Sequence, residues 1–318
     1  LLEADARSGG GRQAMMNPRT DRLRAQIATL DSISTAPTIL QPLLALMRLP
    51  VDEIATDKVV ELVSRDGGIA ASCLRVANSP LFGRRTVETV RGAVMTLGID
   101  RVRSILFGLC MNGTIPADKW VLNQNAFWRH SLGCALVTQT MANKIGYPAS
   151  EKAYLAGLLH DIGFLVMMVL ENSKFRECLR SSMAERCPLD LVEQRLFGYT
   201  HEEAGCILCE HWGFPSELIE VTGCHHSLEL MATASPLVCL VHLSDLLCRV
   251  RNLGYGYTEI MSVTFSQELA WKHLVASYPA LADMDLFRFT LDVDSSMEQI
   301  AALVDTVFAP GIAAGAAS

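Results

Sequence analysis

One continuous apolar segment, AYLAGLLHDIGFLVMMVL over residues 153–170, constrains the fold of this chain more than any other feature. Its composition predicts a core helix, but His160 and Asp161 lie at its centre. Burying two ionisable groups is costly unless something pairs them, and a metal ion is one suitable partner. The pair also makes the segment a poor membrane span, so we expect no membrane association. On these two residues alone, a hydrogen-bonded polar pair at a helix end is the simpler interpretation.

Further residues of metal-binding type lie along the rest of the chain, in or beside apolar segments. The candidate ligands are His130, His160, Asp161, His201, His225, His226 and Asp245. Imidazole and carboxylate together suit Fe, Mn, Zn or Ni better than Mg or Ca. We therefore expect a centre of one or two divalent ions. Because the set is spread over residues 130–245, no local spacing rule tests it, and a metal-free cluster stays open.

The periodicity of the chain is helical almost throughout. Apolar residues recur at helical spacing in segments such as 123–145 and 201–211, and no alternating run of strand length occurs. We therefore predict an all-α fold, with Ser150 and Thr200 as N-caps and residues 112–116 as the best linker candidate. Each candidate ligand then lies at the end or on the inner face of a helix, which is how helical bundles build metal sites.

The charge and cysteine content exclude some function classes. A net charge of −7 argues against broad binding to nucleic acid or anionic membranes. The chain has no helix-turn-helix signature, so we expect no direct DNA binding. Ten cysteines occur without a disulfide-like framework, which suits a reducing cytoplasm. Cys206 and Cys209 are spaced for one helix face, and we interpret them as core residues rather than as a metal or redox pair.

Four motifs carry a resemblance to a known family. They are ASCLRVANSPLFGRR (71–85), AVMTLGIDRVRSILFG (93–108), FWRHSLGCA (127–135) and YLAGLLHDIG (154–163). Over roughly residues 30–250 the chain resembles the HDOD domain, the HD-related output domain of bacterial signalling proteins, within the HD superfamily of metal-dependent phosphohydrolases. The resemblance implies an HD-domain-like helical bundle with an N-terminal helical subdomain. The chain then divides into a flexible tail (1–16), the N-terminal subdomain (17–115), an HD-like metal-site subdomain (116–252) and a C-terminal helical extension (253–318).

The resemblance also implies roles for the candidate ligands. The residues of HD enzymes that hold one metal match His130, His160, Asp161 and Asp245. In members with two metals, Asp161 would bridge to a second ion held by His201 and His225. His226 would be a further ligand or a group that supports one. If the centre is active, a metal-bound water acting with Asp161 would be the catalytic group.

Two departures separate the chain from the catalytic branch that cleaves cyclic dinucleotides. Position 164 is Phe, where that branch carries a Lys that supplies positive charge near the phosphate, and the Gly-Tyr-Pro signature is absent after His226. The resemblance therefore implies that the chain is not a standard cyclic di-GMP phosphodiesterase. We expect a bacterial regulatory protein with a His/Asp metal site, acting with a signalling protein partner or a small nucleotide-like ligand. An active phosphohydrolase on a small phosphoester and a metal-free scaffold stay open as alternatives, and so does the oligomeric state.

Overall fold

Every regular element that the structure describes is a helix, which confirms the predicted all-α fold. The structure, a computed structural model, describes residues 18–33, 39–79, 86–231, 234–251, 253–255 and 264–283, with isolated positions beyond. The predicted tail (1–16), part of the 71–85 motif and most of the predicted extension lie outside the described residues. The division of the chain at residues 115 and 252 stays a prediction.

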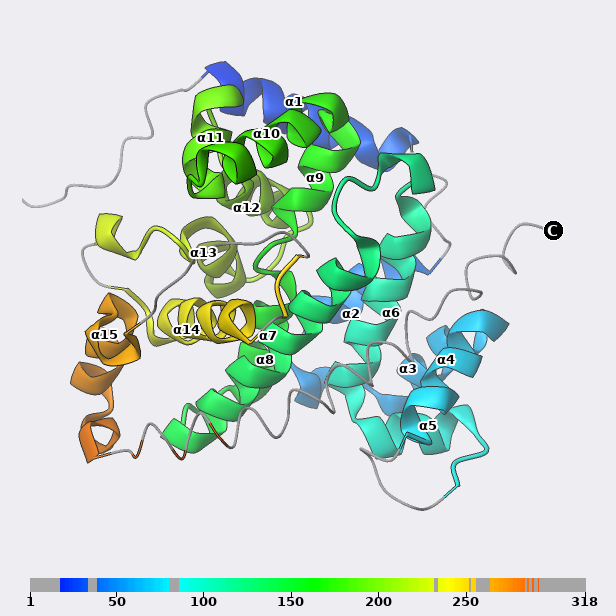
Figure 1. The fold of residues 1–318 in the computed structure, drawn as a ribbon. Coiled ribbons are helices and arrows are strands. Elements are labelled where there is room, and N and C mark those ends of the chain that lie inside the picture. Colours follow the sequence, from blue (N-terminus) through cyan, green and yellow to red (C-terminus); the bar gives the residue numbers. More distant parts are fainter. Residues whose placement is uncertain are drawn as a thin grey trace, which may run out of the picture.

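Helices α7 (Gln124–Ile145) and α8 (Ser150–Leu159) lie side by side through the centre of the molecule (Figure 1). Their close approach needs a glycine, because a Cβ atom on Gly157 would lie 2.7 Å from the carbonyl oxygen of Cys134. Gly146 ends α7 with a φ of 71°, which glycine adopts without strain. The two helices form the scaffold that carries His130 and His160.

Helix α9 (Gly163–Leu170) packs against α12 (His201–His211) directly after the His160-Asp161 pair. A Cβ atom on Gly163 would lie 1.9 Å from the carbonyl oxygen of His201 and 2.8 Å from the backbone nitrogen of Gly205, so no side chain fits there. This backbone contact holds the turn that contains Asp161 beside the first residue of α12.

Further helices complete the bundle around this centre. Helix α13 (Ser216–Cys224) packs on α8 and α12, and α14 (Pro236–Val250) packs on α7. Helix α10 (Asn172–Glu185), paired with α11 (Leu189–Leu196), packs on α9. Helix α15 (Leu269–Ser277) packs on α14.

The apolar segment that opened the sequence analysis forms the core of this bundle. Residues Ser150–Leu170 are long and apolar enough to cross a membrane by length and composition alone, but the bundle buries 89% of the apolar stretch. The segment is also divided into α8 and α9 by the turn at His160 and Asp161. Its burial among other helices accounts for its composition without a membrane.

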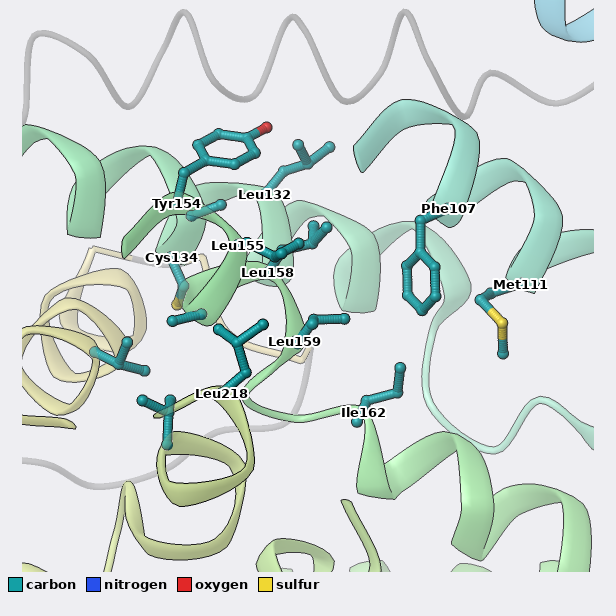
Figure 2. Close-up of a cluster of buried hydrophobic side chains, with 14 of the residues drawn as sticks. Phe107, Met111, Leu132, Cys134, Tyr154, Leu155, Leu158, Leu159, Ile162 and Leu218 are labelled. Carbon is teal, nitrogen blue, oxygen red and sulfur yellow. The ribbon is translucent and has the colours of Figure 1, made fainter. Parts of the chain in front are cut away.

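A second group of helices lies beside the bundle, from the middle to the lower right of Figure 1. Its members are α2 (Leu40–Met47), α3 (Thr56–Ser64), α4 (Gly67–Ala77), α5 (Val90–Leu97) and α6 (Ile99–Thr114). Helix α6 continues through residues 112–114 of the predicted linker, so the connection to the bundle begins only at Ile115. Phe107 and Met111 of α6 share one apolar cluster with Leu159 and Ile162 of the bundle (Figure 2). One continuous core therefore joins the two groups.

The first helix, α1 (Pro18–Ile33), packs on α12 of the bundle rather than on α2–α6. Leu23 and Ile27 are buried, and Arg24 forms a 2.5 Å ion pair with Glu210. Helix α1 thus packs against the helix that presents His201.

Candidate metal centre

The candidate ligands predicted from the sequence lie together in one cluster at the middle of the bundle. His130 comes from α7, His160 and Asp161 from the end of α8 and the following turn, His201 from the start of α12, His225 and His226 from the end of α13, and Asp245 from α14. The N-cap of α12 is Thr200, as predicted, and its capping box with Glu203 begins the helix at His201. Local capping and long-range packing together therefore position the cluster.

The first group of ligand atoms surrounds one oxygen of Asp161. His160 Nε2 lies 2.7 Å and His130 Nε2 lies 3.5 Å from Asp161 Oδ2. His130 Nε2 also lies 3.1 Å from Asp245 Oδ1. The sulfur of Cys134, one helical turn after His130, lies 3.5 Å from the same nitrogen and belongs to the same group of candidate metal-binding atoms. The sequence analysis missed Cys134, although its spacing of four residues from His130 on a predicted helix was visible.

The second group surrounds the other oxygen of the same carboxylate. His225 Nε2 lies 3.3 Å and His201 Nε2 lies 3.4 Å from Asp161 Oδ1. His226 offers a further ring nitrogen, and the donor atoms of this group all lie within 4.8 Å of one another. Asp161 thus faces a different set of imidazoles with each of its two oxygens.

Hydrogen bonds on the outer side of the rings orient the imidazoles. The Nδ1 atoms of His130, His160 and His225 lie 2.6, 2.8 and 3.1 Å from the backbone carbonyl oxygens of Leu253, Gly157 and Val221. The Nδ1 atom of His201 lies 2.7 Å from the carboxylate of Glu193. Since carbonyl and carboxylate oxygens only accept, each Nδ1 carries a proton, and each Nε2 is the ring atom that faces the centre, where it can take up a second proton or a metal ion.

The inner face of the cluster lacks hydrogen-bond donors for the acceptors gathered there. Within the described residues, Asp161 Oδ1, His201 Nε2 and His225 Nε2 are buried and have no hydrogen-bond partner. The Nε2 atoms of His130 and His160 are only 3.2 Å apart, so a positive species, either a proton or a metal ion, has to lie between their lone pairs. Buried polar atoms are normally paired, and nitrogen and carboxylate donors in this arrangement fit divalent transition metals.

The electrostatics of the cluster show the same need for positive charge. Burial raises the pKa of Asp161 and Asp245, but His160 beside Asp161 and Arg249 beside Asp245 outweigh it and hold both values well below the usual range. Burial lowers the pKa of His130, yet its bonds to Asp161 and Asp245 raise the value to about 10. Both carboxylates are therefore ionised, and His130 carries a second proton when no metal competes for it, whereas burial lowers the pKa of His160 and His226.

The cluster is closed to solvent except along one edge. The side chains of His130, His160, Asp161, His201, His225 and Asp245 are each at most 2% exposed. His226 is 20% exposed, and Arg249, which donates to Asp245 Oδ2 at 3.1 Å, is 18% exposed. Any exchangeable ligand would meet this imidazole and this guanidinium first.

Aromatic rings pack against two of the imidazoles of the cluster. Phe164 stacks on His201 with ring centroids 4.3 Å apart, and Tyr255 lies 4.4 Å from the ring of His130. The two aromatic rings also meet edge to face at 5.3 Å. Position 164 thus forms an apolar wall of the centre, and Tyr255, which the sequence analysis did not single out, forms another part of it.

Comparisons with known proteins add a family to this geometry. A family model described as the HDOD domain matches residues 33–228. A solved HDOD domain protein of unknown function from Geobacter sulfurreducens is 27% identical, with a TM-score of 0.76, over 92% of this chain and 99% of its own. A "putative signal transduction protein" from Marinobacter aquaeolei VT8 is 21% identical, with a TM-score of 0.65, over 95% of this chain and 68% of its own. At that identity the second structure shows the fold alone.

A relative among curated proteins matches at similar distance. An uncharacterised protein of Treponema pallidum (strain Nichols) is 24% identical over 258 residues, which cover 78% of this chain and 48% of the relative. The chain therefore spans about half the length of this curated relative. Asp245 and Arg249 lie beyond the end of the family match at residue 228.

Proposed function

Because the chain belongs to the HDOD domain family, we propose that it is a regulatory signalling module built around a pair of divalent metal ions. The observation that carries the proposal is the position of Asp161. One of its oxygens faces His130 and His160, and the other faces His201 and His225. A carboxylate placed in this way can bridge two ions.

The ligand sets follow from the two groups of atoms. The first ion would be held by His130, His160, Asp161 and Asp245, with Cys134 close by. The second would be held by Asp161, His201, His225 and His226. Such a pair supplies strong local positive charge and, in enzymes, can polarise a phosphoryl group.

Charge balance supports the assignment. Four buried carboxylates, Asp161, Asp245, Glu193 and Glu202, lie in or against the cluster, while Arg249 is the guanidinium bonded to it. Uncompensated buried negative charge is costly, so the cluster needs further positive charge from protons or from metal ions. Divalent ions of the Fe, Mn, Zn or Ni type suit these ligands.

The closure of the centre supports a regulatory role over turnover. A substrate would have to reach ions whose ligands are almost completely buried, and Phe164 supplies no positive charge on its side. A buried metal pair can instead stabilise one arrangement of α7, α12 and α14, which a signalling protein partner or a small nucleotide-like ligand would recognise.

Metal content tests the proposal directly. Protein purified without a His-tag should contain two divalent ions per chain by elemental analysis. Asp161→Asn should lose both, because the bridging charge is removed from each position. His211→Asn, at the exposed end of α12, is the matched control and should keep both ions. Wild-type protein that retains less than about a tenth of an ion per chain would instead support the metal-free scaffold.

One observation favours a second candidate function, a metal-dependent phosphohydrolase acting on a small phosphoester. Arg249 lies on the exposed edge of the centre, bonded to Asp245, and so provides the cation that Phe164 does not. The test is turnover of a generic phosphodiester by protein loaded with Mn or Fe. A rate above background that falls in Arg249→Met would establish the enzyme, and a fully loaded protein without turnover would exclude it for that substrate class.

A further inference from the structure

The four imidazoles that face Asp161 differ in what holds their outer nitrogen. His130, His160 and His225 each have a backbone carbonyl oxygen beside Nδ1. His201 alone among these four has a carboxylate there, that of Glu193 on α11, at 2.7 Å. The two proposed metal positions are therefore supported unequally, since His201 belongs to the second position only.

Glu193 is committed to His201 with one oxygen. Its Oε2 accepts from the backbone N–H of His201 at 2.9 Å as well as from the ring Nδ1 at 2.7 Å. Its Oε1 is buried and has no hydrogen-bond partner in the described part of the chain, and the side chain is 0% exposed. The backbone contact places the carboxylate at the N-terminus of α12, where an N–H is unpaired within the helix and the helix dipole favours negative charge. The charge of Glu193 is thus directed at a single residue.

A carboxylate behind a ligating imidazole changes how that imidazole binds a metal. It fixes the proton on Nδ1 and orients the ring. It also makes Nε2 a stronger electron-pair donor to a metal than Nε2 would be with a carbonyl oxygen behind the ring. We propose that Glu193 is a positioning residue that sets the affinity of the second metal position without acting on the first. The inference rests on the proposed pair of metal ions.

Glu202 provides a matched comparison within the same structure. It is buried, comes from the neighbouring helix α12, and accepts from the backbone N–H of His226 and from the hydroxyl of Ser227, both at 2.7 Å. Its nearer oxygen is 3.9 Å from His225 Nδ1, which already lies beside the carbonyl oxygen of Val221. Glu202 therefore holds the backbone after α13, whereas Glu193 acts on an imidazole.

Glu193→Gln separates charge from geometry. The backbone N–H of His201 always donates, so an oxygen of Gln must take the place of Oε2 and can still accept from Nδ1. Ring orientation and tautomer are then kept, and only the negative charge is lost. Glu202→Gln makes the same chemical change at the matched position.

The experiment is a titration of metal-free protein with Mn²⁺, followed by calorimetry and electron paramagnetic resonance. In Glu193→Gln we expect the second dissociation constant to rise roughly tenfold, the lower end of what such supporting groups contribute, with the first unchanged. At limiting metal the spectrum of a coupled Mn pair should give way to that of isolated ions. Glu202→Gln also removes a buried charge next to the cluster but leaves the contacts of every Nδ1 atom in place, so it should raise the second constant by clearly less than Glu193→Gln does and should keep the coupled spectrum.

Each other outcome has a defined meaning. Wild-type protein that binds fewer than two ions overturns both the metal pair and the role of Glu193. Wild-type protein that binds two, with the same two constants in Glu193→Gln, overturns only the role of Glu193. An equal loss in Glu202→Gln also overturns it, since the effect would then be a general result of removing a buried charge. If Glu193→Gln does not fold, Glu193→Asp, which keeps the charge but shortens its reach, is judged by the same criteria.

Discussion

The two helical groups of this molecule pair their buried polar atoms in different ways. In the N-terminal group, the buried Arg103 donates to the carbonyl oxygens of Leu46 and Leu49 at 2.8 and 3.0 Å and pairs with Asp100. In the bundle, Asp161 Oδ1, His201 Nε2 and His225 Nε2 have no hydrogen-bond partner among the described residues. The first arrangement contains a cation and an anion that pair with each other, although Arg103 Nε also has no partner in the described part of the chain, and the second gathers several groups that an added cation would join. The comparison teaches that metal binding should be linked to the stability of the bundle and not to that of α2–α6.

The largest expected effect comes from adding one methyl group beside the centre. Gly163→Ala places a Cβ atom 1.9 Å from the carbonyl oxygen of His201. Because the atoms that it meets belong to the backbone of α12, no side-chain rotation can remove the overlap. We expect a loss of more than about 4 kcal/mol in unfolding free energy, together with loss of the second metal ion. Denaturant unfolding and metal analysis measure the two effects.

The control for this change lies in the N-terminal group. A Cβ atom on Gly67, in the first turn of α4, meets nothing within 4 Å. Gly67→Ala should therefore be neutral or stabilise by up to about 1 kcal/mol, because it restricts the unfolded chain. Equal destabilisation by the two substitutions would contradict the packing argument.

Breaking the buried pair of the N-terminal group should destabilise the protein without touching the metal. Arg103→Met leaves Asp100 and two backbone carbonyl oxygens without their donor. We expect a cost of about 3 kcal/mol, as for other buried ion pairs that lose one partner. The cost should be the same with and without metal, and metal content of the folded fraction should not change. A fall in metal content would show that the two groups are coupled more tightly than proposed.

Removing the metal perturbs the bundle, whereas Arg103→Met perturbs the N-terminal group. At a free metal concentration of a hundred times the dissociation constant, each bound ion should stabilise the protein by about 2.7 kcal/mol. Hydrogen exchange after chelation should speed up in α7, α12 and α14, and exchange in α3–α5 should stay as it was. Uniform loss of protection over all of these helices would remove the distinction between the two groups.

The smallest expected effect compares two helix caps. Thr200 caps α12 at the centre, and Asp66 caps α4 in the N-terminal group with a 2.9 Å bond to the backbone nitrogen of Ile69. Thr200→Ala and Asp66→Ala should each cost about 1 kcal/mol. Only Thr200→Ala should also weaken metal binding, because α12 begins at His201. Calorimetric metal titration of both variants decides whether the position of the cap matters.

Local signals in the sequence predicted most helices but not all of their ends. Thr200 is the N-cap that its position before His201 suggested, and Asn112-Gly113 failed as a linker because α6 continues to Thr114. Ser150 is the first helical residue of α8, with Ala149 before it and no side-chain cap, so this N-cap prediction was wrong. Propensities favour such boundaries only weakly, and helix ends are uncertain by one or two residues.

The residues of the candidate site were also predicted only in part. The residue types and their helical context pointed to the cluster around His160 and Asp161. Cys134, Glu193 and Tyr255 were missed. Glu193 has an ordinary place on an amphipathic helix, and nothing near it in the sequence marks it as the partner of His201.

The sequence by itself determined an all-helical chain and a set of imidazoles and carboxylates that must be paired inside it. Both follow from local periodicity and from the cost of burying ionisable groups. Only the tertiary structure decided that Asp161 turns one oxygen to each set of imidazoles, and that backbone carbonyls orient three rings while Glu193 orients the fourth. The contact of His130 with Leu253 joins residues far apart in the chain, whereas those of His160 and His225 lie within one helical turn. A carbonyl oxygen is the same in every residue and so carries no sequence signal, and the packing of the helices decides which of these rings meet around Asp161.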